Sequence, residues 1–465
     1  MTELSRARRF LVLGICSLSL FIVGLDTTIV MLALPDIQHD LGSSVTGLQW
    51  TIDAYTITLA SLLMLAGSTG DRLGRRRTFQ TGLALFTLGS LLCSVAPGTG
   101  WLIVFRIAQA VGGSMMNPVA MSIITNTFTI PRERAQAIGL WGGVIGLSMA
   151  LGPVLGGALV AAAGWRAVFL VNVPIGVAAI VLTALFVPES KAARPRRLDP
   201  VGQVLVIALL GSLTFGIIEG PHLGWVSPWI VGCFVVAALA LLGILGYERR
   251  RAEPLLELRF FRSVPFSGAT VIAICGFMGL AGFLFLNSLY LQQVRGFSPL
   301  HAGLLTLPMA VLAGVLAPVS GRIVGTRGPR LPLIVAGVGL TASAVLLTTV
   351  VPGTPVPVLV LAYAIFGIGF GMLNAPITNT AVSGMPREQA GVAAAVATTS
   401  RQVGTSLGVA VLGGAGAAGW WVMAGCGAVV LGLGILTTGR WARRTASAAT
   451  AASLDPEPRS AVTTR

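Results

Sequence analysis

Long apolar stretches with almost no charge are the feature that most constrains how this chain can fold. A membrane-crossing helix needs about 20 predominantly apolar residues. Charged residues make up 10% of the chain, against about 25% in soluble globular proteins. The sequence therefore predicts an all-α polytopic membrane protein of about fourteen spans, and it excludes a soluble globule, a disordered chain and a nucleic-acid binder as the main class. The predicted spans cover residues 10–34, 48–69, 78–97, 101–126, 135–162, 166–187, 201–219, 228–247, 266–291, 302–324, 331–351, 357–380, 390–413 and 417–439.

The basic residues are distributed asymmetrically, which predicts the topology. Of 31 Lys and Arg residues, 27 fall in segments on one side of the membrane if the N-terminus is inside. Cytoplasmic loops carry such an excess, so we expect both termini in the cytoplasm. The run after Arg6, Arg8 and Arg9 begins like a signal peptide. It continues to Leu34 with no small-residue cleavage signature, so we interpret it as an uncleaved first span.

Two tripeptides recur at nearly the same offset and indicate an internal repeat. Thr125-Asn126-Thr127 returns as Thr378-Asn379-Thr380, and Pro131-Arg132-Glu133 returns as Pro386-Arg387-Glu388. Parallel six-helix repeats are one known transporter plan. We therefore expect an N-terminal six-helix bundle over 1–190, cytoplasmic connectors and two inserted spans over 191–262, a C-terminal six-helix bundle over 263–444 and a disordered cytoplasmic tail over 445–465.

Three charged residues inside apolar runs are candidates for proton coupling, because a charge there costs about 3 kcal/mol on insertion scales. Asp26, in the first span, must face a cavity or a partner. Desolvation disfavours its charged form, which makes it the first candidate for a proton carrier. Asp53 and Arg106 are the next candidates. Alternatively, Asp53 is a helix N-terminal acid stabilised by the helix dipole, and Arg106 extends to the outer interface.

Two glycine-rich elements are further candidate sites. Between the second and third spans the chain reads GSTGDRLGRRR from Gly67 to Arg77. Its glycines permit a tight turn, and Asp71 can pair with an arginine or cap a neighbouring helix. In the fifth span Gly152, Pro153, Gly156 and Gly157 allow close helix approach and loosen the helix, although ordinary packing is the alternative.

Other polar positions give weaker signals. Met115, Asn117, Arg401 and Gln402 are candidates for the wall of a substrate cavity, with plain packing as the alternative for the first two. The segment from Glu219 to Trp225 closes the seventh span, and we interpret it as an interfacial turn. The five cysteines are scattered and the three histidines lie in or beside loops, so we expect neither a metal site nor a disulfide framework.

The motifs together resemble the major facilitator superfamily, and within it the fourteen-span drug:proton antiporters. The first span (LDTTIVMLALP from Leu25), the start of the second (WTIDAY from Trp50), and the RIAQA segment from Arg106 are similar to that family in order and position. The resemblance implies that Gly67, Asp71, Arg72, Gly74, Arg75 and Arg76 form a gating loop, that Arg106 takes part in proton transfer, and that the fifth-span Gly/Pro element belongs to an antiporter rather than a symporter. The chain departs from the family pattern at Met31, Ala110 and Ser148.

These features predict a proton-coupled efflux transporter that exports amphipathic drugs or antibiotics by alternating access. The alternatives are a transporter of the same fold for a nutrient, siderophore or metabolite, and a membrane sensor that transports nothing. There is no P-loop and no nucleophile–base pair, so we expect neither ATP use nor an enzyme. We expect no cofactor and no nucleic-acid partner; the expected partners are a small amphipathic molecule, protons and the lipid bilayer. The Arg, Ala and Gly excess is typical of a GC-rich bacterial genome, so we expect a protein of a bacterial inner membrane. We also expect a monomer.

Overall fold

Helices make up the regular structure of the computed structural model, which describes residues 5–191, 199–248, 250–251, 258–383, 390–439, 441–442 and 444–445. Most of the connector after Lys191, the tail from residue 446 and the second Pro-Arg-Glu copy at 386–388 lie outside the described residues. The elements are α1 (Arg6–Leu41), α2 (Val45–Leu73), α3 (Arg75–Ser94), α4 (Thr99–Thr127), α5 (Pro131–Ala163), α6 (Ala167–Leu170), α7 (Asn172–Phe186), α8 (Pro200–Leu223), α9 (Pro228–Glu248), η1 (Leu258–Arg262), α10 (Val264–Leu289), η2 (Tyr290–Val294), α11 (Pro299–Arg327), α12 (Arg330–Thr348), α13 (Val356–Gly371), α14 (Asn374–Val382), α15 (Ala390–Leu407), η3 (Gly408–Leu412), α16 (Gly413–Ala415), η4 (Gly416–Ala418) and α17 (Gly419–Thr437).

Polar caps begin several of the helices. At the start of α2, Ser44 Oγ accepts a hydrogen bond from the Gly47 amide at 3.1 Å. At the start of α8, the Asp199 carboxylate accepts from the Gly202 amide at 2.9 Å. Such caps satisfy amide groups that have no partner within the helix. Helix α1 ends at Leu41 and is followed by Gly42, whose φ of +61° is a left-handed conformation that glycine adopts without steric cost.

The described helices include ten that are long and apolar enough to cross a membrane. A bent pair within α2, Val45–Leu63 and Leu65–Leu73 at 52°, raises the number to eleven. Helices α3, α5 and α15, which correspond to three of the expected spans, are not counted among these, although α5 contains the shorter apolar segment Leu151–Ala163. The chain is thus a multi-pass helical membrane protein, and the count of fourteen spans stays a prediction.

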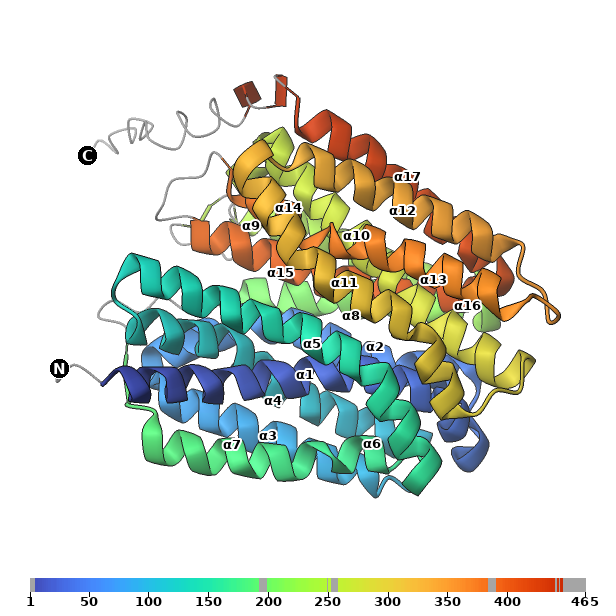
Figure 1. Cartoon of the computed structure of the whole chain (residues 1–465), viewed down its shortest axis with the longest axis horizontal. Helices are drawn as coiled ribbons and strands as arrows, with labels where there is room; N and C mark the ends of the chain where they lie inside the picture. Colours follow the sequence, from blue (N-terminus) through green and yellow to red (C-terminus); the bar gives the residue numbers. More distant parts are fainter. Residues whose placement is uncertain are drawn as a thin grey trace.

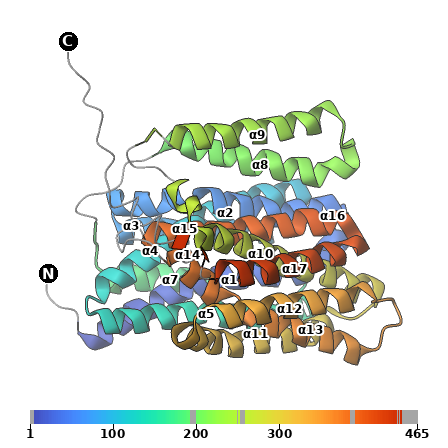
Figure 2. The ribbon, with the colours of Figure 1, turned by 90° about the horizontal axis from the view of Figure 1, so that it is seen from above.

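The helices run roughly side by side in two groups, with one pair set apart. Helices α1 to α7 pack together, and α10 to α17 form the second group (Figure 1). The pair α8 and α9 lies along one edge of the molecule, where α8 packs on α2 (Figure 2). Two contacts join the groups most extensively: α5 packs on α11, and α2 packs on α15. The repeated Thr-Asn-Thr tripeptides both lie near the ends of helices, at Thr127 in α4 and Thr380 in α14.

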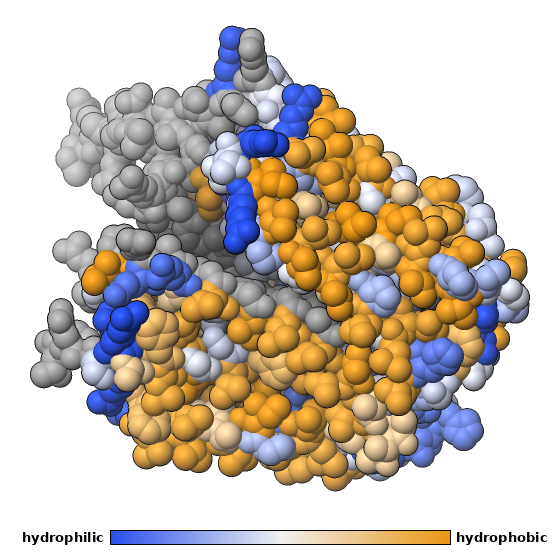
Figure 3. Space-filling view, viewed as in Figure 1, coloured by the Kyte–Doolittle hydropathy of each residue, from blue (hydrophilic) through white to orange (hydrophobic). Residues whose placement is uncertain are grey.

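The outer surface is apolar, as a lipid-facing surface requires. Leu88, Leu185, Val204 and Leu239 are each more than half exposed, and apolar side chains cover most of the visible face while polar ones gather towards its two ends (Figure 3). In water such a surface would be unfavourable, but lipid tails are as apolar as leucine. The interior, by contrast, holds the buried charges described below.

Glutamine side chains join the two groups at the end of the molecule distant from the N-terminus, which we call the distal junction. The Gln49 amide of α2 donates to the Val409 and Ala410 carbonyls of η3 at 3.0 and 3.2 Å. Gln292 of η2 donates to the Leu32 carbonyl of α1 at 2.9 Å. Both η2 and η3 are π-helical, and the widened turn of a π-helix changes which backbone groups have partners within the helix. The two groups are therefore held together at this end, where α5 and α11 also meet (Figure 1).

Candidate functional site

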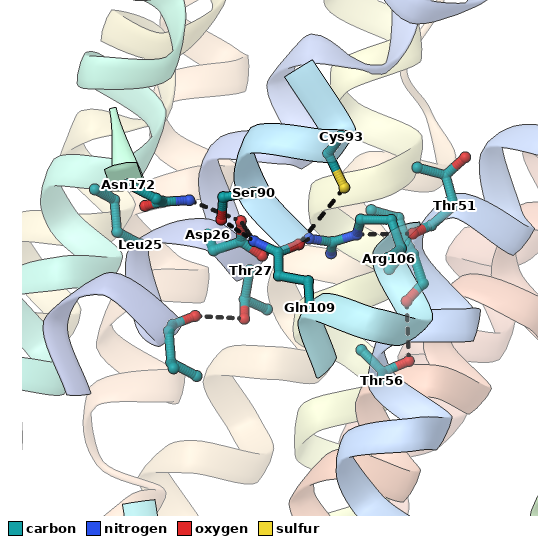
Figure 4. A network of polar contacts seen from close by, with 12 residues as sticks. Leu25, Asp26, Thr27, Thr51, Thr56, Ser90, Cys93, Arg106, Gln109 and Asn172 are labelled. Carbon is teal, nitrogen blue, oxygen red and sulfur yellow. Dashed lines mark hydrogen bonds and ion pairs between the residues drawn. The ribbon is translucent and has the colours of Figure 1, made fainter. Parts of the chain in front are cut away.

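The centre of the N-terminal group holds a buried ion pair between α1 and α4. Arg106 Nη1 lies 2.5 Å from Asp26 Oδ2, and the side chains are 1% and 0% exposed. A buried charge without a partner would be strongly destabilising. The partner required for Asp26 is thus Arg106, which points into the bundle rather than to the interface (Figure 4).

Neighbouring helices satisfy the remaining hydrogen-bonding groups of the pair. Gln109, one turn after Arg106 on α4, accepts from Arg106 Nη1 at 2.7 Å and donates to Asp26 Oδ1 at 2.9 Å. Asn172, the first residue of α7, donates to the same oxygen at 3.1 Å. Ser90 of α3 accepts from Gln109 at 2.7 Å. The carboxylate of Asp26 is therefore bonded through both oxygens (Figure 4).

Helix α2 covers the guanidinium group. Arg106 Nε donates to the Thr51 carbonyl at 3.1 Å, and the guanidinium carbon lies 4.0 Å from the centre of the Tyr55 ring. A cation over an aromatic face is favourable, and more so where water is excluded. The charge of Arg106 is thus held by an anion, an amide oxygen, a carbonyl oxygen and a ring.

Asp53 lies two residues after Thr51 on α2 but has a different environment. Its side chain is 0% exposed. Thr56 Oγ1 donates to Asp53 Oδ1 at 3.3 Å, whereas Oδ2 has no hydrogen-bond partner among the described residues. Ser406 of α15 faces this carboxyl group from the other helix group. Asp53 is eight residues into α2, so a cap at the helix N-terminus does not account for it.

The basic motif after the second span is mostly helical rather than a loop. Helix α2 continues to Leu73, and Gly74, with φ +116°, is the single residue between α2 and α3. Within it, Asp71 Oδ1 accepts from Arg75 Nη2 at 2.8 Å and from Nε at 3.1 Å. Gly70 approaches α4 closely, because a Cβ there would lie 2.9 Å from Val119 Cγ2. Gly67, Arg72 and Arg76 lie in the same two helical ends.

The N-terminus of α3 is capped by a residue that the sequence analysis missed. Glu189 follows α7, and its carboxylate accepts from the backbone amides of Arg76 and Arg77 at 3.1 and 3.3 Å. A Cβ on Gly74 would lie 2.7 Å from Glu189 Oε1. An acid at a helix N-terminus is stabilised by the free amides and the helix dipole. Glycine at 74 is thus favoured by its φ angle, and any larger residue there would displace the capping carboxylate.

The Gly/Pro element of α5 makes contacts in two directions. Towards α1, a Cβ on Gly152 would lie 1.9 Å from Thr28 Oγ1, and one on Gly156 would lie 2.9 Å from Ile29 Cγ1. Towards the other group, a Cβ on Gly157 would lie 2.5 Å from the Pro299 carbonyl oxygen of α11. Likewise, a Cβ on Gly303 of α11 would lie 2.2 Å from the Pro153 carbonyl oxygen. The element therefore links the helix of Asp26 to the distal junction.

The predicted cavity residues are spread over both groups. Met115 lies against α3, since a Cβ on Gly82 would come within 2.9 Å of its Cβ. Asn117 Oδ1 is buried without a hydrogen-bond partner among the described residues. Arg401 Nη2 donates to Thr378 Oγ1 at 2.6 Å, and Gln402, next to it on α15, is half-buried. The structure does not bring these four into the Asp26 network, and their role as a cavity wall stays a prediction.

Gln109, Asn172 and Glu189 are the polar partners that the sequence analysis did not select. Gln109 and Asn172 are amides within apolar runs, at the i+3 position from Arg106 and before Pro174 respectively, and that placement was the available signal. No group of three or more His, Cys, Asp or Glu side chains that could hold a metal gathers in the part of the chain that the structure describes. The site consists instead of the Asp26–Arg106 ion pair and, nearby on α2, the buried acid Asp53, which has no cation partner among the described residues.

The fold and this charge network define a multi-pass membrane transport protein. Residues 16–409 match the family described as the Major Facilitator Superfamily, and the chain belongs to that superfamily. It is 38% identical over 410 residues to the tetracenomycin C resistance and export protein of Streptomyces glaucescens, covering 88% of this chain and 76% of that protein. It is 35% identical over 396 residues to the multidrug resistance protein Stp of Mycobacterium tuberculosis, covering 85% and 74%. A crystal structure of the peptide transporter POT in complex with sulfate superposes with a TM-score of 0.69 over 93% of this chain and 95% of that chain, at 16% identity, which shows the shared fold.

Proposed function

We propose that the protein is a proton-coupled exporter of amphipathic drugs or antibiotics, of the fourteen-span drug:proton antiporter type. The relatives named for multidrug resistance and for antibiotic resistance and export support the substrate class. The observation that carries the coupling is the pair of buried acids in one helix bundle, one paired with an arginine and one without a cation. Because the two acids have different environments, the number of protons that they hold together can change when the transporter changes conformation. Such a change couples proton movement to transport.

Asp53 is the acid that holds a proton in this conformation. An ionised carboxylate there would be a buried charge that faces only the hydroxyl groups of Thr56 and Ser406, with no cation beside it among the described residues. Asp26, by contrast, has the Arg106 guanidinium as its counter-charge, with Nη1 2.5 Å from Oδ2. In the proposed cycle, a proton moves between bulk water and these acids as the two helix groups separate and close. Arg106 is the cation that either acid can approach when it gives up its proton.

The conformation supports alternating access with the distal side closed. The glutamine contacts and the α5–α11 contact both lie at the distal junction. Rocking of two bundles about a central site is the general mechanism for such repeats. In this proposal the domain limits are those expected from the sequence, the distal side faces outward, and both termini face the cytoplasm.

The same proposal includes the remaining polar positions. The Asp71 to Arg76 segment controls separation of the groups at the cytoplasmic end, where Glu189 and Arg75 fix its geometry. Arg401 and Gln402 line the substrate path in the C-terminal group, and Asn117 lines it in the N-terminal group, where its Oδ1 is free to accept a hydrogen bond.

Proton coupling of this kind supplies enough free energy for resistance. One proton is worth about 1.4 kcal/mol per unit of pH difference, and about 2.3 kcal/mol per 100 mV of membrane potential. Together these sustain a concentration ratio of about several hundred-fold, because each 1.4 kcal/mol is a factor of ten.

A drug-susceptibility panel tests the proposal. A bacterial host lacking its own pumps expresses wild-type chain, Asp53→Asn or empty vector, with expression matched by immunoblot. We expect wild-type chain to raise the inhibitory concentration of at least one amphipathic antibiotic and Asp53→Asn to lose that effect. Equal susceptibility of the wild-type and empty-vector strains across the panel would contradict drug export.

A further inference from the structure

The inserted helix α8 packs along the face of α2 that carries Asp53. The end of α8 at the distal surface is polar. Thr46, Trp50, Asp53, Ile57 and Ala60 are spaced by four, three, four and three residues, so they lie on one face of α2. Thr46 Oγ1 and His222 Nε2 are 2.5 Å apart. Trp50 Nε1 donates to Glu219 Oε1 at 2.8 Å. Two titratable groups of α8 are thus attached to the two turns of α2 that precede Asp53.

These groups form a gradient of exposure from the distal surface inward. His222 is exposed, Glu219 is half-buried and Asp53 is fully buried. Trp50 and Asp53 are about 4.5 Å apart along the axis of α2, at 1.5 Å per residue. Beyond Asp53, a small cavity between α2, α8 and α15 has room for about one water molecule. Ser406, which faces the Asp53 carboxyl group, also lines that cavity.

Other titratable groups near this path are few. Helix α9, which packs on α8, carries Cys233 near its start and Tyr247 and Glu248 at its opposite end. Helix α15 carries Arg401, more than a turn from Ser406, and η3 and α16 carry no titratable residue. In the described part of the chain, Glu219 is therefore the carboxylate that α8 brings to the distal end of the Asp53 face.

We propose that Glu219, with His222 at the surface, is the proton-uptake relay that loads Asp53. This inference rests on the proposed proton coupling. A hydronium ion at the distal surface gives its proton to the Glu219 carboxylate, directly or through His222. The O–H bond of Glu219 then breaks as the proton passes along the α2 face to the Asp53 carboxylate, by rotation of the two side chains. Glu219 returns to the carboxylate that accepts from Trp50, so the relay is unchanged after each transfer.

The relay gives the inserted pair a role that two six-helix bundles alone would lack. Helix α8 is attached to α2 at both ends, since Gln203 also donates to the Ser61 carbonyl at 2.6 Å. It therefore moves with the N-terminal group and keeps Glu219 beside Trp50 when the distal junction opens. Proton uptake can then follow a path separate from the substrate path between the groups.

The test uses the full chain in proteoliposomes, with the antibiotic that gives the largest resistance in the susceptibility panel as the probe. Glu219→Gln keeps an oxygen that accepts from Trp50 but cannot carry a proton. Its matched control, Trp50→Phe, removes that hydrogen bond and keeps the acid. Two rates are measured for each variant: accumulation driven by a pH gradient, and counterflow of labelled against unlabelled probe without a gradient.

We expect Glu219→Gln to slow pH-driven accumulation by at least about tenfold, as loss of a proton-transfer group does, and to leave counterflow near the wild-type rate. Glu219→Asp should recover part of the loss. Trp50→Phe, which keeps the acid but removes the hydrogen bond that positions it, should slow pH-driven accumulation less than Glu219→Gln does. Wild-type accumulation by Glu219→Gln would overturn the relay. Equal loss of counterflow would also overturn it, because Glu219 would then be structural. Failure of the wild-type chain to respond to the pH gradient would refute proton coupling itself, and the relay with it.

Discussion

Neutralising Asp26 should destabilise the protein because it leaves a buried arginine without its anion. In Asp26→Asn, the side-chain oxygen can still accept from Gln109 and Asn172, at the positions now 2.9 and 3.1 Å from Oδ1. The new amide nitrogen then faces Arg106 Nη1, now 2.5 Å from Oδ2, so two donors oppose each other. Breaking one partner of a buried ion pair costs about 3–5 kcal/mol. Arg106 keeps two oxygen acceptors, Gln109 and the Thr51 carbonyl, so we expect a loss of about 3 kcal/mol, at the lower end of that range.

The double variant Asp26→Asn/Arg106→Gln separates charge from packing. It removes both charges together, so that neither is left buried without a counter-charge. We expect it to recover about 2 kcal/mol relative to Asp26→Asn, as a coupling energy between contacting residues. The assay is unfolding of the purified protein in mixed detergent micelles, followed by tryptophan fluorescence. A loss below about 1 kcal/mol in the single variant, or additive losses in the double variant, would refute the account of the pair.

Transport by the double variant then tests the role of the pair in coupling. If Asp26 and Arg106 take part in the proton cycle, the stable neutral pair binds the drug but does not accumulate it against a gradient. If the pair only holds the helices together, the double variant exports like the wild-type chain. Full proton-coupled export by a stable Asp26→Asn protein would leave Asp53 as the sole proton carrier.

Three further predictions concern gating and topology. Gly157→Leu places atoms within 2.5 Å of the first turn of α11. This overpacking costs about 1–3 kcal/mol, so efflux from intact cells should fall. Ala158→Leu on the exposed face is the control, and equal efflux by the two variants would contradict the proposed packing role. Gly74 has a φ of +116°, and a Cβ there would lie 2.7 Å from a carboxylate oxygen. Gly74→Leu should therefore abolish efflux without preventing membrane insertion, which fractionation measures. Normal efflux would argue against a gating role. In a cysteine-free background, a cysteine at Ser298 should react with an impermeant thiol reagent in intact cells and one at Ala193 should not; the reverse labelling would overturn the orientation.

The helical membrane architecture could be predicted from the sequence because lipid imposes it locally. Every backbone polar group in a bilayer must be satisfied within its own segment, so apolar length alone identifies helices such as α1, α9 and α10. The need for a partner at Asp26 and at Arg106 also followed from residue type and position. The number of spans could not be predicted in the same way. Helices α3, α5 and α15 were expected to be spans, but they are not long and apolar enough to be identified as spans by length and hydropathy alone.

The pairing itself could not be predicted, because it depends on how helices far apart in sequence rotate against each other. Asp26 and Arg106 are 80 residues apart, and Gln109 or Asn172 become partners only once α1, α4 and α7 are packed. The same holds for Glu189, which caps α3 from 113 residues away along the chain. Asp53 shows the converse case: the sequence gives no sign that a similar acid in the neighbouring helix has no cation.

Proton-driven accumulation in inverted membrane vesicles tests the central claim most directly. Inversion places the distal side inside the vesicle, so an acidic interior should drive the drug inward while protons leave. We predict that wild-type vesicles accumulate the drug only with that gradient, that a protonophore releases it, and that Asp53→Asn vesicles exchange the drug but do not accumulate it. Accumulation that is unaffected by the protonophore, or equal in Asp53→Asn, would contradict the account.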